Sequence, residues 1–65
     1  MTAISAEQFR ALVELVPGNP SLRVGLVTFL RAAGREREAQ AAQVAAERLF
    51  PDDADVRRLR QPPGG

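Results

Sequence analysis

Two prolines divide this chain at a fixed interval, and that interval constrains the fold more than any other feature. Pro17 and Pro51 stand 34 residues apart (17 to 51), within the segments 15–20 (LVPGNP) and 49–54 (LFPDDA). In both segments apolar residues precede the proline and a short polar turn follows it. An apolar residue and an arginine come next in each copy, at 22–23 and at 56–57. An internal period of this length is typical of stacked helical repeats, which present a binding surface rather than an active site.

The length of the chain limits the architecture to one small domain. A chain of 65 residues buries only about 60% of its unfolded surface, so we expect low stability. Three helices and a short fourth fit within this length, but a sizeable pocket does not. We therefore predict one helical domain over residues 1–60 and a disordered tail over 61–65 (QPPGG).

The composition argues against catalysis, metal binding and nucleic-acid binding. Cysteine and histidine are both absent, which removes the thiol nucleophile, the thiolate ligand and the commonest general base. The net charge is +1, and the nine basic and eight acidic residues are interspersed along the chain. Such a pattern is typical of a solvated helical surface. We expect a protein that is not an enzyme and has no catalytic, cofactor-binding or metal-binding residues.

The sequence does not indicate membrane insertion or export. No apolar run approaches the roughly 18 residues that a membrane-spanning helix needs, and residues 1–4 (MTAI) do not resemble a signal peptide. We therefore expect a cytoplasmic protein. Every basic residue is arginine and alanine is abundant, which indicates a GC-rich genome and leads us to expect a bacterial source.

The first helical segment carries clear start and stop signals. Ser5 is a good N-cap and Gln8 stands three residues later, at the spacing of a capping box, while Ile4 and Phe9 have the spacing of a hydrophobic staple. The helix is expected to end before Pro17. Its apolar residues recur at the spacing of one helix face: Phe9, Leu12, Val13 and Val16.

The second segment begins at Asn19-Pro20, an N-cap followed by the residue favoured at the first helical position. Gly34 stands where a left-handed C-terminal cap is needed. Gly25 weakens the helix by about 1 kcal/mol relative to alanine, so either a neighbouring backbone approaches this position or the glycine is simply tolerated. The expected apolar stripe consists of Leu22, Leu26, Phe29, Leu30 and Ala33.

Two further segments follow. One runs from about 36 to 50, with glutamates in its first turn and Arg48 in its last, which suits the helix dipole, and Pro51 stops it. Its expected buried face is Ala39, Ala42, Ala46 and Leu49, flanked by Gln43 and Val44. The last segment is shorter. Asp53 is its candidate N-cap, and its apolar residues are Ala54, Val56 and Leu59.

Residues 20–53 resemble one complete tetratricopeptide repeat, a helix–turn–helix unit of about 34 residues. The matching residues are Leu26 in the first helix, Gly34 at the turn, Ala39 and Ala46 at the small positions of the second helix, and Pro51 at the end. The sequence departs from the repeat signature at Arg23, Val27, Leu30 and Gln43.

The flanking segments extend this resemblance to about one and a half repeats. The first segment resembles the second helix of a preceding, truncated repeat, with Phe9 at its aromatic position and Pro17 at its terminal proline. The last segment looks like the capping helix that closes such arrays. The resemblance implies an all-α, tetratricopeptide-like antiparallel helical hairpin, three helices plus a short C-terminal capping helix. An unrelated three- or four-helix bundle is the alternative.

The resemblance also implies protein–protein interaction, as a docking or adaptor module, through the first helix of the repeat. Four residues of that helix point away from its apolar stripe: Ser21, Val24, Thr28 and Arg31. A peptide or helix of a partner protein would receive apolar contact from Val24, a hydrogen bond from Thr28 and an ion pair from Arg31. The alternative is an ordinary solvated face.

Two other functions stay open. The first and last segments each have apolar edges that favour self-association, as a homodimer or a structural bundle, unless the last segment caps its own chain. A small helix-turn-helix DNA-binding domain would aim four residues at a major groove: Arg35, Arg37, Gln40 and Gln43. The near-neutral charge argues against that function.

Two charged clusters near the C-terminus are explained better by helix ends than by ligands. The acidic cluster at 52–55 lacks the further ligands and the glycine of a calcium loop, and helix capping accounts for it. The arginines at 57, 58 and 60 are a candidate phosphate contact. Because the acidic cluster adjoins them, a solvated helix end is the stronger interpretation.

Overall fold

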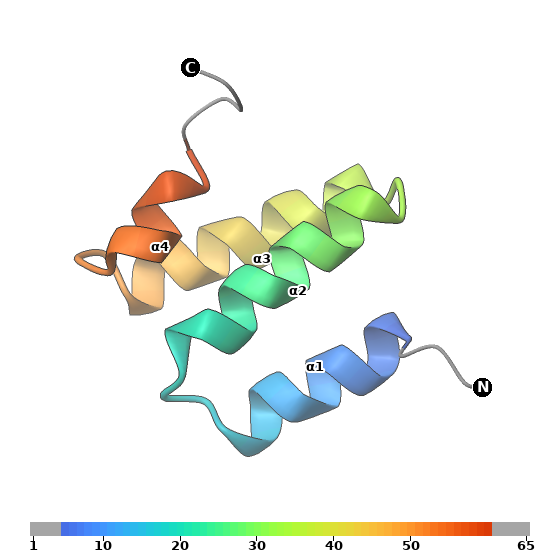
Figure 1. Ribbon diagram of the computed structural model, residues 1–65, viewed down its shortest axis with the longest axis horizontal. Coiled ribbons are helices and arrows are strands. Elements are labelled where there is room, and N and C mark those ends of the chain that lie inside the picture. The colour runs from blue at the N-terminus through green and yellow to red at the C-terminus, as the bar shows by residue number, and fades with distance from the viewer. Residues whose placement is uncertain (1–4, 61–65) are drawn as a thin grey trace.

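The computed structural model describes residues 5–60, and all regular structure within that range is helical. The helices are α1 (Ala6–Leu15), α2 (Pro20–Ala32), α3 (Glu36–Leu49) and α4 (Ala54–Arg58) (Figure 1). The predicted all-α class is therefore confirmed for this range. The proposed staple residue Ile4 and the tail 61–65 lie outside the described residues.

Each predicted N-cap side chain forms its expected hydrogen bonds. Ser5 and Gln8 form a capping box: Ser5 Oγ accepts from the Gln8 amide at 3.2 Å, and Gln8 Oε1 accepts from the Ser5 amide at 2.8 Å. Asn19 accepts from the Ser21 amide at 3.0 Å at the start of α2. Asp53 accepts from the amides of the second and third residues beyond it, at 3.0 and 3.1 Å. These bonds satisfy amides that have no partner within their own helix.

The end of α2 is closed by a left-handed glycine. Gly34 has φ 79, a conformation that residues with a Cβ adopt only at a cost. The Arg35 amide donates to the Leu30 carbonyl at 2.9 Å, and the Gly34 amide donates to the Arg31 carbonyl at 3.0 Å. This pair of bonds is a Schellman cap, and it confirms the left-handed C-terminal cap predicted at Gly34.

Helix α2 is the centre of the molecule. It contacts all three other helices, and its contact with α3 is the most extensive. Figure 1 shows α2 and α3 side by side and antiparallel, with α1 along the other flank of α2 and α4 near the C-terminal end of α3. Because α2 has neighbours on three flanks, its buried sector is wider than a single apolar stripe.

This central position changes which residues form the core. The main cluster comprises Ala6, Val13, Leu26, Val27, Leu30 and Ala39, with Leu22, Phe29, Ala42 and Leu59 packed against it. Val27, which the predicted stripe omitted, is 0% exposed. Ala33, which the stripe included, is exposed because α2 ends at Ala32 and Ala33 is already the C-cap. Full burial of an aliphatic side chain is worth about 1.5–3 kcal/mol.

Helix α3 also differs from its predicted boundary and face. It ends at Leu49, one residue before the predicted limit, and Phe50 is the C-cap, with its amide 2.8 Å from the Ala46 carbonyl. Leu49, expected on the buried face, is 55% exposed, whereas Gln43, expected on the flank, is buried. The buried sector of α3 is therefore shifted towards Gln43.

Candidate partner-binding surface

One side of α1 packs on α2. Ala6 and Val13 are buried, and Phe9 is half-buried between them. The Phe9 and Phe29 ring centroids are 5.9 Å apart, within the range of favourable aromatic pairs. A Cβ added to Gly25 would lie 2.7 Å from Cζ of Phe9. Gly25 therefore admits an aromatic ring, not the neighbouring backbone considered from the sequence.

A second side of α1 is directed towards α3 through charged residues. Arg10 Nη2 lies 3.1 Å from Oε1 of Glu38, and Glu7 lies 3.9 Å from Arg35. Arg35, the N-cap of α3, also forms an ion pair with Glu38 in the first turn of that helix. These solvent-exposed pairs add little stability, but they establish which side of α1 is turned to α3.

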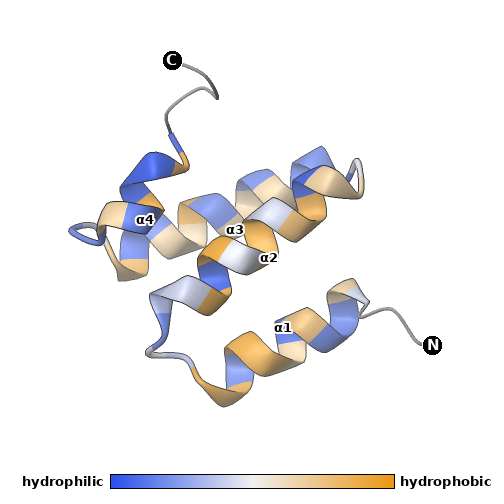
Figure 2. Ribbon diagram, in the orientation of Figure 1, coloured by the Kyte–Doolittle hydropathy of each residue, from blue (hydrophilic) through white to orange (hydrophobic). Residues whose placement is uncertain are grey.

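The third side of α1 is apolar and uncovered. Leu12 is 40% exposed, Leu15 is 76% exposed and Val16, the C-cap of α1, is 48% exposed. At about 100° per residue, Leu12 and Val16 lie beyond Phe9, on the side of α1 opposite to Arg10. We call Leu12, Leu15 and Val16 the α1 strip, and Figure 2 shows the hydrophobic colour of this part of the chain. The predicted apolar face of α1 is thus divided, because α2 covers only its Phe9–Val13 side.

The open side of α2 holds most of the partner-binding residues predicted from the sequence. Ser21 and Thr28 are exposed and Val24 is partly buried. The Thr28 hydroxyl donates to the Val24 carbonyl at 3.0 Å, which leaves its oxygen as an acceptor for a partner. This side of the helix lies between Gly25, which meets α1, and Arg31, which meets α3.

Arg31 has a different environment from the other three predicted residues. Its guanidinium donates a short hydrogen bond to Oε1 of Gln43 on α3. It is only partly exposed. Arg31 therefore joins α2 to α3 at the edge of the open side, and the predicted ion pair with a partner would have to compete with this bond.

The α1 strip and the open side of α2 adjoin each other. Leu26 and Leu30 are buried whereas Thr28 is exposed, so we infer that the Arg10–Glu38 pair closes the side of α2 that carries the two leucines. The α1 strip, opposite to Arg10, must then border the other side of α2, where Thr28 lies. We call the combined surface the docking face and define it by six uncharged residues: Leu12, Leu15, Val16, Ser21, Val24 and Thr28.

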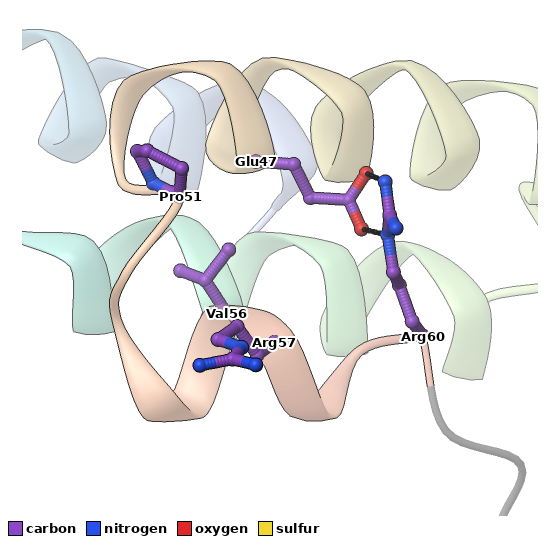
Figure 3. A pocket seen from close by; sticks show the side chains of 5 residues that line it. All are labelled: Glu47, Pro51, Val56, Arg57 and Arg60. Carbon is purple, nitrogen blue, oxygen red and sulfur yellow. Dashed lines mark hydrogen bonds and ion pairs between the residues drawn. The ribbon is translucent and has the colours of Figure 1, made fainter.

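A second concave region lies between α3 and α4. It is an open hollow of about 410 Å³ lined by Glu47, Pro51, Val56, Arg57 and Arg60 (Figure 3). Glu47 and Arg60 form an ion pair at its rim, with Nε and Oε2 2.6 Å apart. The Arg60 hydrogen bond lowers the pKa of Glu47, and the same bond raises the pKa of Arg60. Because the charged groups bind each other, this region is a seam between two helices rather than a ligand site.

Three other charged residues near the C-terminus have partners within the chain. Asp53 caps α4, and Asp55 lies 3.3 Å from Arg58. No group of potential metal ligands occurs among residues 5–60. Gln43, which sequence reasoning placed on a flank, lies buried between Arg31 and Glu47. Its neighbours in the sequence gave no signal for this role, because both partners come from separate turns or helices.

Within residues 5–60, none of the helices combines the length and the apolar composition needed to cross a bilayer. The chain matches no protein-family model, no curated protein and no solved structure.

Proposed function

We propose that this protein is a non-catalytic interaction module that binds a helix on the docking face. The observation that carries the proposal is the α1 strip. Three large apolar side chains are exposed on one side of a helix whose other sides are packed on α2 or ion-paired towards α3. A single exposed leucine on a small protein is ordinary, but a row of three on one helix marks an interaction surface.

The spacing of the α1 strip suits a helical occupant. Leu12, Leu15 and Val16 stand at positions i, i+3 and i+4, the spacing with which amphipathic helices anchor to one another. Burying apolar surface contributes about 25 cal/mol per Å², so an occupant that covers all three side chains gains substantial free energy. Thr28 adds a hydrogen-bond acceptor beside the strip.

A comparison of α1 with α3, based on the 34-residue period, also supports a helical occupant. Adding the 34-residue period to position 5, the N-cap of α1, and to positions 8 and 12 of α1 gives Ala39, Ala42 and Ala46 of α3. Those alanines are buried or half-buried in the structure, whereas Leu12 and Gln8 are exposed. The tetratricopeptide-like arrangement, in which α1 is the second helix of an incomplete repeat, accounts for this difference and remains part of the proposal.

The DNA-binding alternative has less support from the geometry. Gln43 is 7% exposed and accepts a hydrogen bond from Arg31, so it has no access to a groove. Arg35 is engaged by Glu38 and lies 3.9 Å from Glu7. Half of the four residues required by that function are thus held by the protein itself. We propose a protein partner, with neither nucleic acid nor membrane involved.

Affinity capture with matched variants tests the proposal. We expect wild-type protein to retain a specific partner from lysate and Leu12→Glu/Leu15→Glu to lose it. Val44→Glu is the control, because Val44 is an apolar residue of α3 with 38% exposure, close to the 40% of Leu12. Equal capture by all three proteins would contradict a role for the docking face.

A further inference from the structure

We propose that the occupant of the docking face is a second copy of this chain, so that two molecules pair through α1 in an antiparallel, two-fold arrangement. This inference rests on the proposed function and specifies its partner. It requires that α1 supply both the apolar side chains and the surface that receives them. Three features of α1 support self-association: its exposed side chains, the charges around them and the area available for contact.

The α1 strip is chemically self-complementary. An antiparallel pair places Leu12 near the symmetry axis, where it meets its own counterpart, and the two copies of Leu15 and Val16 extend outwards on either side. Among the helices of residues 5–60, α1 carries the exposed leucines and valine in one row. The exposed apolar residues of α3, Val44 and Leu49, stand five positions apart and so on different sides of their helix.

The charges of α1 do not oppose this pairing. Glu7 and Arg10 lie on the side turned to α3, where they form ion pairs with Arg35 and Glu38. Glu14 is two positions from Leu12, which places it on nearly the opposite side of the helix. Ala11, which flanks the strip, is small and uncharged, so two α1 helices can approach closely. No like charges are therefore brought together at the interface.

The available area becomes adequate when both helices of the docking face take part. Two ten-residue helices alone bury less than a specific interface requires. Because the strip borders the open side of α2, each incoming α1 also covers Ser21 and Thr28 of the other copy, and the two α1–α2 pairs form a four-helix arrangement. We estimate roughly 1,000 Å² of total buried surface, at the lower limit of specific interfaces. An interface of this size indicates a weak dimer whose formation depends on protein concentration.

The oligomeric state in solution tests this inference. Sedimentation velocity between about 10 µM and 1 mM, a range in which weak dimers dissociate, should show the mass of the wild type rising from 7.0 kDa towards twice that value. Leu15→Glu should remain monomeric and Val44→Glu should behave like the wild type. Leu15 is 76% exposed, so its substitution should leave the helical circular dichroism unchanged.

Disulfide trapping provides a second measurement, because the chain contains no cysteine. Leu12→Cys places a thiol at the symmetry axis and should yield a covalent dimer on mild oxidation, whereas Gln40→Cys on the exposed side of α3 should not. Equal crosslinking of the two variants would contradict the arrangement. Masses that continue to grow beyond the dimer would also contradict it, since they indicate head-to-tail association.

The measurements distinguish an incorrect dimer proposal from an incorrect docking-face proposal. A wild type that remains monomeric at 1 mM overturns self-association. If Leu12→Glu/Leu15→Glu still loses a captured partner in that case, the docking face stands and its occupant is another protein. If Leu12→Glu/Leu15→Glu captures the partner as well as the wild type does, both proposals are overturned.

Discussion

Arg60 and Glu47 form a two-point ion pair in which Nε and Nη2 of Arg60 lie 2.6 and 3.5 Å from the two carboxylate oxygens of Glu47. Glu47 also accepts from Nε2 of Gln43 at 3.4 Å, and Gln43 accepts from Arg31. A continuous polar chain therefore runs from α2 through α3 to Arg60, two residues beyond the end of α4. It holds the C-terminal turn against the α2–α3 pair, while Val56 packs beneath it with 0% exposure.

The Glu47–Arg60 ion pair should make folding stability depend on pH. The hydrogen bond from Arg60 lowers the pKa of Glu47 from its ordinary value of 4.5. A carboxyl group whose pKa is depressed in the folded state stabilises that state above its unfolded pKa, and the contribution disappears as pH falls through the folded value. We expect Glu47→Gln to reduce stability at pH 7 and to have a smaller effect at pH 3.

Urea denaturation at the two pH values measures this difference. Glu14→Gln is the matched control, because Glu14 is exposed on α1 and has no ion pair among the described contacts. An effect of Glu47→Gln that is as large at pH 3 as at pH 7 would show that the carboxylate charge is not what stabilises the contact.

Val56 should anchor α4. Val56→Ala removes two methyl groups from a side chain that is fully buried, and we expect a loss of about 2 kcal/mol from the transfer and cavity terms together. Val44→Ala, at a partly exposed valine of α3, should change stability by less than about 0.5 kcal/mol. Thermal or urea unfolding followed by circular dichroism compares the two, and similar losses would argue against α4 as a packed element.

Gly25 should be required by the ring of Phe9 and not by the backbone. An alanine Cβ there would lie 2.7 Å from Cζ of Phe9, so the strain of overpacking should outweigh the gain in helix propensity. We expect Gly25→Ala to destabilise the protein by about 1 kcal/mol. In a Phe9→Ala background the same substitution should become stabilising by up to about 1 kcal/mol. A double-mutant cycle measured by urea unfolding checks the coupling, and additive effects would refute it.

Gly34 should be the glycine at which backbone conformation matters. Its φ of 79 lies in the left-handed region, so Gly34→Ala should cost about 1 kcal/mol. Gly34→Asn should cost less, because asparagine tolerates that region. Gly18→Ala is the control: Gly18 has no positive φ, and an added Cβ would meet no atom within 4 Å. Equal losses at the two glycines would contradict this assignment.

The helix boundaries were predictable from the sequence because their signals act over a few residues. Ser5, Asn19 and Asp53 each cap a helix by accepting from amides two or three positions ahead. Gly34 closes α2 through bonds to the preceding turn. A cap needs no distant partner. The residues that form it stand a few positions apart, so it can be recognised from the sequence alone.

The candidate site was predictable only in part. The sequence located Ser21, Val24 and Thr28 on the side of the helix away from the apolar stripe, and in the structure they flank the contact with α1. It did not separate Leu12 and Val16 from Phe9 and Val13, because all four satisfy the same helical spacing. Nor did it place Arg31 against Gln43, since that bond depends on how α3 lies beside α2.

The sequence by itself determined where the helices of residues 5–60 begin, and it placed the ends of α2 and α3 to within one residue. It also determined which side chains are apolar enough to be buried. Only the tertiary structure decided which of those side chains are covered. Val27 is buried because α2 has neighbours on three flanks, and Leu15 is exposed because no helix of the described chain reaches the outer side of α1. Local hydrogen bonds are set by residues a few positions apart, whereas burial is set by whichever helix arrives from elsewhere in the chain.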